Sequence, residues 1–201
     1  IISPDGILKP DGAGCMAVSG NWNNTGTFSA NGGTVTFNGS GPQQILGANN
    51  TFYNLSVQNS AVFPSDDTDV DSAQPLTILN NLVVSSGQFQ PASGSTIENV
   101  SIESGGILRP DYLGTFTVSG DRNRQQDGWF EANNGTVTFN GTGAQAINGG
   151  GNFYDLVIDN TAGLSDATDV DPDIAINVDH LLTVQQGQFQ PPANSRLRNV
   201  V

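Results

Sequence analysis

Apolar and polar residues alternate over short stretches of this chain, and Gly, Asn, Asp and Pro separate the stretches. The segments 34–37 (Thr-Val-Thr-Phe) and 54–58 (Asn-Leu-Ser-Val-Gln) are typical. Alternation with a period of two predicts strands that bury one face, and the separating residues are turn formers. Helix-forming Ala, Leu, Glu and Lys are scarce as a group. The pattern therefore predicts an all-β protein of many short strands.

The whole pattern recurs after about 100 residues. Matching blocks begin at 6 and 106, 18 and 118, 33 and 135, 52 and 153, 68 and 168, and 87 and 187. The offset is 100 at both ends of the unit and rises to 102 in its middle. The insertions and deletions fall in Gly-, Asn-, Asp- and Pro-rich segments, as loops tolerate. The chain is thus predicted to contain two copies, 1–100 and 101–201, of one repeat.

A finer repeat of 18–22 residues lies inside each copy. The segment 81–91 resembles the segment 99–110, and both read as an apolar-x-apolar strand followed by a turn and Gly-x-apolar. Such a unit cannot bury its apolar face alone, whereas stacked units can. This favours one continuous parallel β-solenoid with an 18–22-residue coil. At about 4.8 Å per coil, about ten coils make a rod of roughly 50 Å.

Two tandem immunoglobulin-like β-sandwiches of about 100 residues each are the alternative. They fit the chain length equally well. They give no reason for an 18–22-residue repeat, and the paired Cys residues that flank the core Trp of antibody domains are absent. The solenoid is therefore the preferred fold.

Composition narrows the function. The chain has 201 residues, 19 acidic and 6 basic, and a formal net charge of −13. So few basic residues make nucleic-acid binding improbable. The single Cys allows no internal disulfide, and no apolar run is long enough to insert into a membrane. We expect no enzymatic activity. Lyases built on β-helices need a base near clustered carboxylates, and here only Lys9 and Arg109, each two residues before an Asp (Asp11 and Asp111), resemble that arrangement.

The two ends of the chain fall at the same point of the repeat. Ile1 and Ile2 match Ser101 and Ile102, and 199–201 matches 99–101. Neither end shows the polar, atypical sequence of a capping repeat. We expect open coil ends, formed by Ile1, Ile2, Asn199, Val200 and Val201, at which the coil continues. It does so either as a longer tandem array or by head-to-tail stacking of separate subunits.

Acidic residues cluster at one place in each copy. The residues concerned are Asp66, Asp69 and Asp71 in the first copy and Asp166, Asp169 and Asp171 in the second. Alternate carboxylates in an extended loop can converge on Ca²⁺, which takes six to eight oxygen ligands. A solvated acidic loop that keeps the rod soluble is the alternative interpretation.

Aromatic residues offer a second candidate chemistry. Trp22, Tyr53, Trp129 and Tyr154 have rings that stack on sugars when exposed, and packing within the core is the plainer interpretation. Arg122 and Arg124 lie between Gly120 and Gly128, the segment in which the second copy gains two residues. We expect them to decorate a loop rather than to bind an anion.

The blocks 33–45 and 52–59, with their second copies at 135–147 and 153–160, resemble the β-solenoid repeats of large secreted and cell-surface bacterial proteins. The resemblance covers nearly the whole chain. It implies that the protein is exported, that it lies outside the cell or on its surface, and that it forms a stalk or fibre with an adhesin-like role.

Three functions then compete. The first is a structural subunit or repeat segment of an extracellular filament or surface stalk, with itself as partner. The second is a carbohydrate- or surface-binding adhesin module. The third, a polysaccharide-active β-helix enzyme, has the least support.

Overall fold

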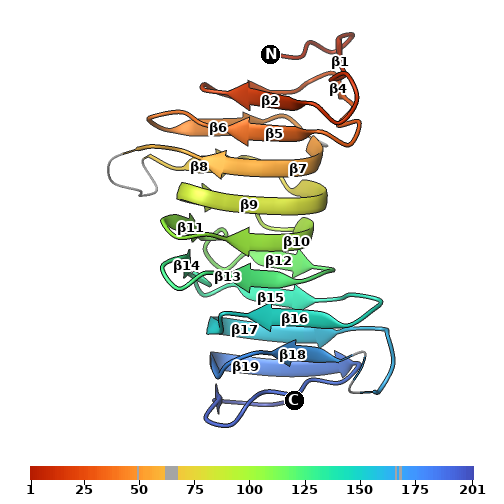
Figure 1. Cartoon of the computed structure of the whole chain (residues 1–201), viewed down its shortest axis with the longest axis vertical. Coiled ribbons are helices and arrows are strands. Elements are labelled where there is room, and N and C mark those ends of the chain that lie inside the picture. Colours follow the sequence, from red (N-terminus) through yellow and green to blue (C-terminus); the bar gives the residue numbers. More distant parts are fainter. Residues whose placement is uncertain (49, 62–67, 166, 168) are drawn as a thin grey trace.

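The computed structural model describes residues 1–48, 50–61, 68–165, 167 and 169–201. In this part of the chain there is no helix, and all regular structure is β. The chain winds into about nine stacked coils with a mean spacing of about 21 residues, which is a parallel β-solenoid (Figure 1). The predicted fold class is confirmed, and the immunoglobulin-like alternative is excluded because every strand pair is parallel.

In chain order the strands are β1 (Ile7–Leu8), β2 (Cys15–Val18), β3 (Trp22–Asn23), β4 (Thr27–Phe28), β5 (Thr34–Phe37), β6 (Gln43–Leu46), β7 (Asn50–Gln58), β8 (Val70–Ser72), β9 (Leu76–Gln90), β10 (Ser95–Ile102), β11 (Gly106–Leu108), β12 (Thr115–Val118), β13 (Arg122–Arg124), β14 (Trp129–Phe130), β15 (Thr136–Phe139), β16 (Gln145–Asn148), β17 (Gly151–Asp159), β18 (Val170–Pro172), β19 (Ile176–Gln186) and β20 (Arg196–Leu197). Strands β1 to β10 of the first copy correspond in order to β11 to β20 of the second.

Three ladders of parallel strands run along the rod, and we name them walls A, B and C. Wall A contains β2, β5, the second half of β7, the middle of β9, the second half of β10, β13, β16 and β18. Wall B contains β3, β6, β8, the end of β9, β11 and β14, followed by the first parts of β17 and β19 and by β20. Wall C contains β1, β4, the first parts of β7, β9 and β10, then β12, β15 and the second parts of β17 and β19.

The second copy is turned by one wall relative to the first. Strand β2 lies on wall A and its counterpart β12 on wall C, while β3 lies on wall B and β13 on wall A. At about 21 residues per coil, a 100-residue repeat covers about 4.7 coils, which is about one-third of a coil short of five. Equivalent residues of the two copies therefore face different sides of the rod.

Coil length is not uniform. Thr77 pairs with Thr96, a step of 19 residues, as the sequence predicts. Asn54 pairs with Asn81, a step of 27, because the segment that contains the acidic cluster lies between them. The stack thus accommodates coils of different length.

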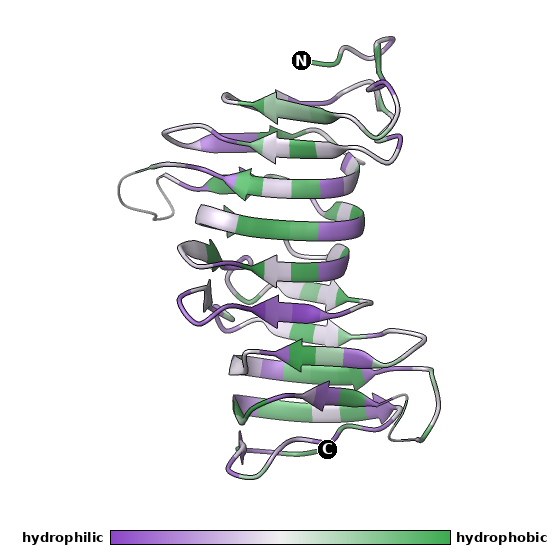
Figure 2. Cartoon of the chain, viewed as in Figure 1, coloured by the Kyte–Doolittle hydropathy of each residue, from purple (hydrophilic) through white to green (hydrophobic). Residues whose placement is uncertain are grey.

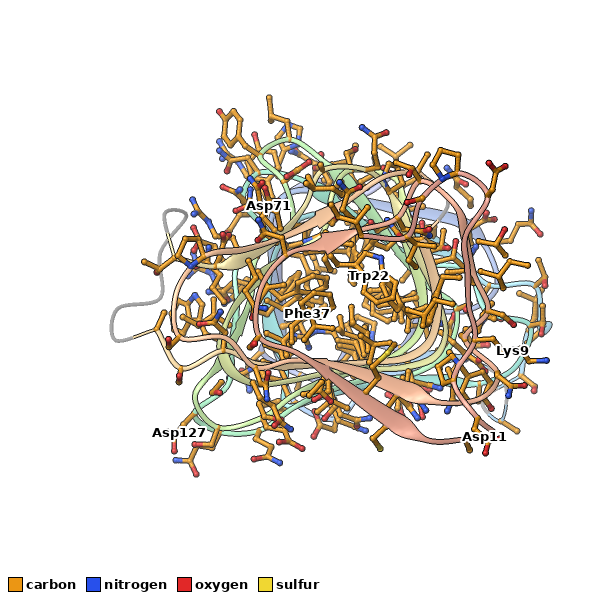
Figure 3. All side chains as sticks on the ribbon, turned by 90° about the horizontal axis from the view of Figure 1, so that it is seen from above. Lys9, Asp11, Trp22, Phe37, Asp71 and Asp127 are labelled. Atoms are coloured by element: carbon orange, nitrogen blue, oxygen red, sulfur yellow. The ribbon has the colours of Figure 1, made fainter. Side chains whose placement is uncertain are left out.

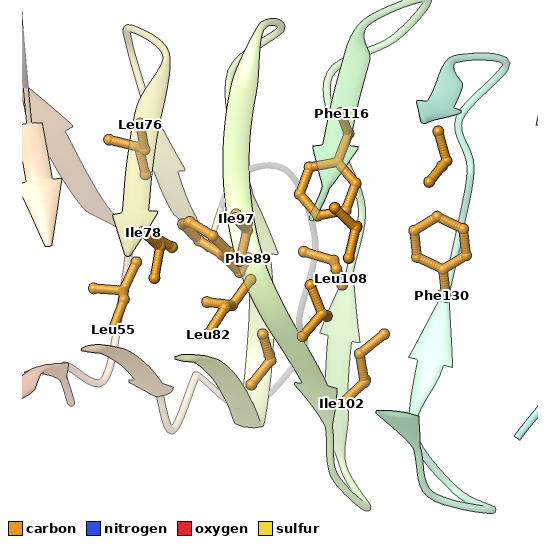
Figure 4. Close-up of a cluster of buried hydrophobic side chains, with 14 of the residues drawn as sticks. Leu55, Leu76, Ile78, Leu82, Phe89, Ile97, Ile102, Leu108, Phe116 and Phe130 are labelled. Carbon is orange, nitrogen blue, oxygen red and sulfur yellow. The ribbon is translucent and has the colours of Figure 1, made fainter. Parts of the chain in front are cut away.

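Side chains that alternate inward build a continuous core along the axis. Phe37, Phe52, Phe89, Phe116, Phe139 and Phe153 are completely buried. Figure 2 shows the apolar positions repeating from coil to coil, and Figure 3 shows Phe37 and Trp22 inside the coil while Lys9 and Asp11 lie outside. In Figure 4 Leu55, Leu82 and Ile102 follow one another in successive coils. Each coil buries its apolar face on the next, which is the source of stability in a solenoid.

Candidate functional site

The residues predicted to form the ends lie on the first and last coils, at opposite ends of the rod (Figure 1). Ile2 pairs with Asn24 and Val200 with Leu182. Ile1 and Val201 are largely exposed. Each end segment thus pairs with the coil on its inner side, and its other edge faces outward.

The acidic clusters are only partly described. Asp66 and Asp166 lie outside the described residues. The carboxylate-bearing residues Asp69 and Asp169 are buried, and their carbonyl oxygens accept hydrogen bonds from Gln43 N and Gln145 N. Among the described residues, no group of three or more His, Cys, Asp or Glu side chains is placed to hold a metal ion. Calcium binding by Asp69, Asp71, Asp169 and Asp171 therefore stays a prediction.

The four aromatic candidates have different environments. Trp22 is 5% exposed and lies in the core, so the plainer interpretation, packing within the core, is confirmed for this ring. Tyr154 is half-buried, with its ring stacked on His180 at a centroid distance of 4.8 Å. Tyr53 is partly exposed, and Trp129 is 59% exposed. Trp129 is the most accessible of the four rings.

In each copy, one wall lacks the pairing between two successive strands, and the missing pairing is at the same point of the repeat. In the first copy β4 pairs with β1 and not with β7, and in the second β14 pairs with β11 and not with β17. We name these two places the ladder gaps. Because a gap leaves backbone groups without ladder partners, side chains have to complete the wall there.

Neutral side chains fill the ladder gap of the first copy. The Trp22 ring packs against Phe28 and Phe52, with centroid distances of 4.8 and 5.6 Å. Its Nε1 donates to Asn50 Oδ1 at 2.9 Å, and Asn24 Nδ2 donates to the same oxygen at 3.2 Å. Asn50 Nδ2 donates in turn to the carbonyl oxygen of Gly47 at 2.8 Å. The first gap is filled by an uncharged network, in which the buried Asn24 Oδ1 has no hydrogen-bond partner.

Guanidinium groups fill the ladder gap of the second copy. Arg122 takes the place of Trp22, and its Cζ lies 4.8 Å from the ring centroid of Phe130 and 5.4 Å from that of Phe153. Gly151 takes the place of Asn50, and a Cβ on it would lie only 3.0 Å from Arg122 Nη2. The small residue thus makes room for the guanidinium, which stacks on two aromatic faces by cation–π attraction.

Arg124 is the second cation of this gap and takes the place of Asn24. Its Nη1 donates to the carbonyl oxygen of Gly128 at 3.0 Å, and its Nη2 donates to that of Gly149. Gly149 has a φ of 80°, and a Cβ there would collide with the Arg124 carbonyl oxygen at 2.0 Å. Only glycine fits this left-handed position, so the carbonyl that holds Arg124 is fixed in place.

The buried charge of Arg122 is incompletely compensated. Its side chain is 1% exposed; Nη1 donates to the carbonyl oxygen of Gly150 at 2.6 Å, and Nε and Nη2 have no hydrogen-bond partner. Burial and, after it, the neighbouring charge of Arg124 lower the pKa of Arg122 from its usual range to about 9, while the carboxylate of Asp173 opposes the shift. Both cations therefore favour a negative charge beside them.

A hollow of about 240 Å³ lies beside this gap. Arg124, Trp129, Gly149, Gly151, Asn152 and Asn177 are among its lining residues. A second hollow of about 250 Å³ shares Trp129 and Asn152, extends to Tyr154, and has the acidic residues Glu131 and Asp179 in its lining, so a carboxylate is favoured only in the first hollow. The exposed indole and Arg124 thus line the same hollow, while Arg122 is buried behind it.

The expectation that Arg122 and Arg124 merely decorate a loop is wrong. Both lie on β13, and the inserted residues follow them in the turn before β14. The sequence signal that marks the site is a pair of exchanges between the copies: Trp22 is replaced by Arg122, and Asn50 by Gly151. Its meaning depends on the contact between the two positions, which the sequence does not show.

Comparison with known proteins gives no relative. No family model, curated protein or solved structure matches the chain. In the described part of the chain there is also no helix that has the length and apolar character to cross a membrane.

Proposed function

We propose that this chain is a structural segment of an extracellular filament or surface stalk whose coils stack head to tail onto a further copy of the same solenoid. The observation that carries the proposal is the junction between the two copies inside the chain. There the second copy continues the ladders of the first without interruption, turned by one wall.

The junction has a definite register. Residues 106–108 of the second copy pair with residues 87–89 of the first. The equivalent residues at the two ends are 6–8 and 187–189, with nearly the same sequences: Gly-Ile-Leu in both 6–8 and 106–108, and Gly-Gln-Phe in both 87–89 and 187–189. A surface that accepts its own copy once within the chain has the shape and hydrogen-bonding pattern to accept it again.

The surface of the rod suits an exposed location. The net charge of −13 repels neighbouring rods sideways, while the end coils present backbone edges. Association is thereby directed along the axis. The resemblance to secreted and cell-surface repeats supports an extracellular setting.

Cross-linking tests the contact directly. Cysteines introduced at Ile7 and Gln188, in a chain whose exposed Cys15 is replaced by the Thr of the second copy, come within disulfide range only if one molecule stacks on the next. We expect oxidation to give a ladder of covalent multimers. The matched control, cysteines at Ile7 and Asn123, places one of the two in the middle of the rod and should stay monomeric. Equal cross-linking of both pairs, or of neither, would contradict the proposal.

Electron microscopy tests the symmetry. Each repeat of about 4.7 coils advances the axis by roughly 22 Å, and each chain by roughly 45 Å. We expect unbranched filaments in which successive repeats turn by about one-third of a revolution. Rods that remain one chain long at high protein concentration would contradict stacking.

A further inference from the structure

We infer that the ladder gap of the second copy binds a short saccharide that carries a carboxylate, with its ring on Trp129 and its carboxylate at Arg124. This inference goes beyond the filament and does not depend on assembly. Three features of the gap support it.

The first feature is the local charge. Arg122 and Arg124 both lie on β13, Arg122 in the core and Arg124 half-buried. Neither forms an ion pair with a described residue, and the buried atoms Arg122 Nε, Arg122 Nη2 and Arg124 Nε have no hydrogen-bond partner. Two guanidinium groups lie here beside one carboxylate, that of Asp173, which accepts a hydrogen bond from Gly149 N at 2.8 Å, so the gap is locally positive in a chain of net charge −13. A planar guanidinium is suited to a carboxylate, and a charged hydrogen bond in a sheltered place is stronger than one in water. The charge therefore selects an anionic group.

The second feature is the exposed indole. Trp129 takes the place of Thr27, so the second copy gains a large apolar ring on the outer face at the same gap where it gains two arginines. An exposed aromatic ring costs solubility unless it packs against something, and the flat apolar face of a sugar ring is a suitable partner. Asn152 and Asn177, whose side chains hydrogen-bond to each other at 2.7 Å, lie in the same hollow and supply amide groups for hydroxyls.

The third feature is size. The two adjoining hollows of about 240 and 250 Å³ share Trp129, and together they reach the range of roughly 300–1,000 Å³ typical of small-molecule sites. That space suits one or two sugar rings. A long polyanion would meet the acidic surface of the rest of the rod, so the ligand is a short or terminal acidic saccharide.

The first copy provides the control, because it has the same fold without this chemistry. Arg124→Asn and Trp129→Thr install the residues of the first copy at the equivalent positions. Arg198→Asn and Tyr112→Thr remove an arginine and an exposed aromatic ring elsewhere. The fluorescence of the buried Trp22 and the circular dichroism spectrum report whether each variant is folded.

The test is a titration of the purified chain with digalacturonic acid, in which calorimetry measures the binding affinity. We expect binding that falls at least tenfold for the dimethyl ester, and at least tenfold in Arg124→Asn and in Trp129→Thr, with both control variants unchanged. Absence of binding, equal binding of acid and ester, or full binding by a folded Trp129→Thr variant would overturn the inference. Competition by an equal concentration of acetate would also overturn it, because the site would then recognise a free carboxylate and not a sugar.

Discussion

At the residue scale, the clearest difference between the copies is the exchange of Trp22 and Asn50 for Arg122 and Gly151. The neutral pair satisfies its hydrogen bonds, while Arg122 keeps two donors unpaired in the core. A buried charge without a partner lowers stability, and replacing buried charges with well-packed apolar groups is often stabilising. The second copy therefore carries a stability cost that the first does not.

Transplanting the neutral pair should remove that cost. We expect Arg122→Trp combined with Gly151→Asn to raise the free energy of unfolding by about 1–4 kcal/mol, as measured by urea denaturation near neutral pH. Gly151→Asn alone should destabilise, because its Cβ would lie 3.0 Å from Arg122 Nη2. A double variant less stable than the native chain would show that Arg122 is well accommodated.

The gain should depend on pH in a defined direction. The pKa of Arg122 is about 9 in the folded chain, owing to burial and then to Arg124, with Asp173 opposing, and it returns to its higher usual range on unfolding. Above pH 9 the unfolded chain binds more protons at this residue, so the native chain gains stability as pH rises. The advantage of the double variant is therefore full below pH 9 and shrinks above it.

Much at this scale could not be predicted from the sequence. Trp22 and Trp129 are both beside Gly, Asn or Phe residues in short strands, yet one is in the core and the other is exposed. Alternation indicates that neighbours face opposite sides, but which side is inward depends on register across coils. Only the pairing of β3 with β6 and of β14 with β11 decides it.

At the element scale, the side-chain amide of one glutamine hydrogen-bonds to three segments of each copy, and we call this arrangement the amide bracket. Gln145 Nε2 donates to the carbonyl oxygens of Val118 and Gly120, and its Oε1 accepts from Gly141 N and Asn160 Nδ2. Gln43 makes the equivalent four bonds in the first copy. The bracket satisfies backbone groups at the turn between the fifth and sixth strands of each copy, where the ladder itself does not.

Removing one bracket should cost much of the chain's stability. Gln145→Leu leaves buried donors and acceptors unpaired, at about 1–3 kcal/mol for each group, so we expect a loss of at least about 3 kcal/mol in urea unfolding. The control Gln126→Leu, at an exposed turn position, should change stability little. Equal effects of the two substitutions would mean that the bracket contributes nothing beyond side-chain burial.

The sequence predicts the elements better than their arrangement. The alternating segments 34–37 and 54–58 do lie in strands, β5 and β7, and the repeat of 18–22 residues matches the coil. The continuous strand β9, which runs through all three walls, reads in the sequence as separate units because Asn80, Asn81 and Gly87 resemble turn residues. The corner geometry of a solenoid accommodates such residues within a strand, which local propensity does not reveal.

At the scale of the whole molecule, the two copies form one rod with a regular turn between them. The pairing of Ile2 with Asn24 on wall B is repeated by Ile102 with Arg124 on wall A. The repeat is thus a screw operation, an advance of roughly 22 Å with about one-third of a revolution. Three repeats are needed before equivalent residues, including the ladder gaps, face the same side again.

Adding a third copy tests this operation without relying on assembly. A chain in which residues 101–200 are duplicated in tandem places a new 106–108 segment next to 187–189, the same contact that 106–108 makes with 87–89. We expect one continuous solenoid whose maximum dimension in small-angle X-ray scattering grows by roughly 22 Å while its cross-section stays constant. If the extra copy folded as a separate body, the dimension would grow more and the cross-section would no longer be uniform. A constant cross-section with the expected increment would instead establish that the end of this solenoid is a surface on which the repeat builds.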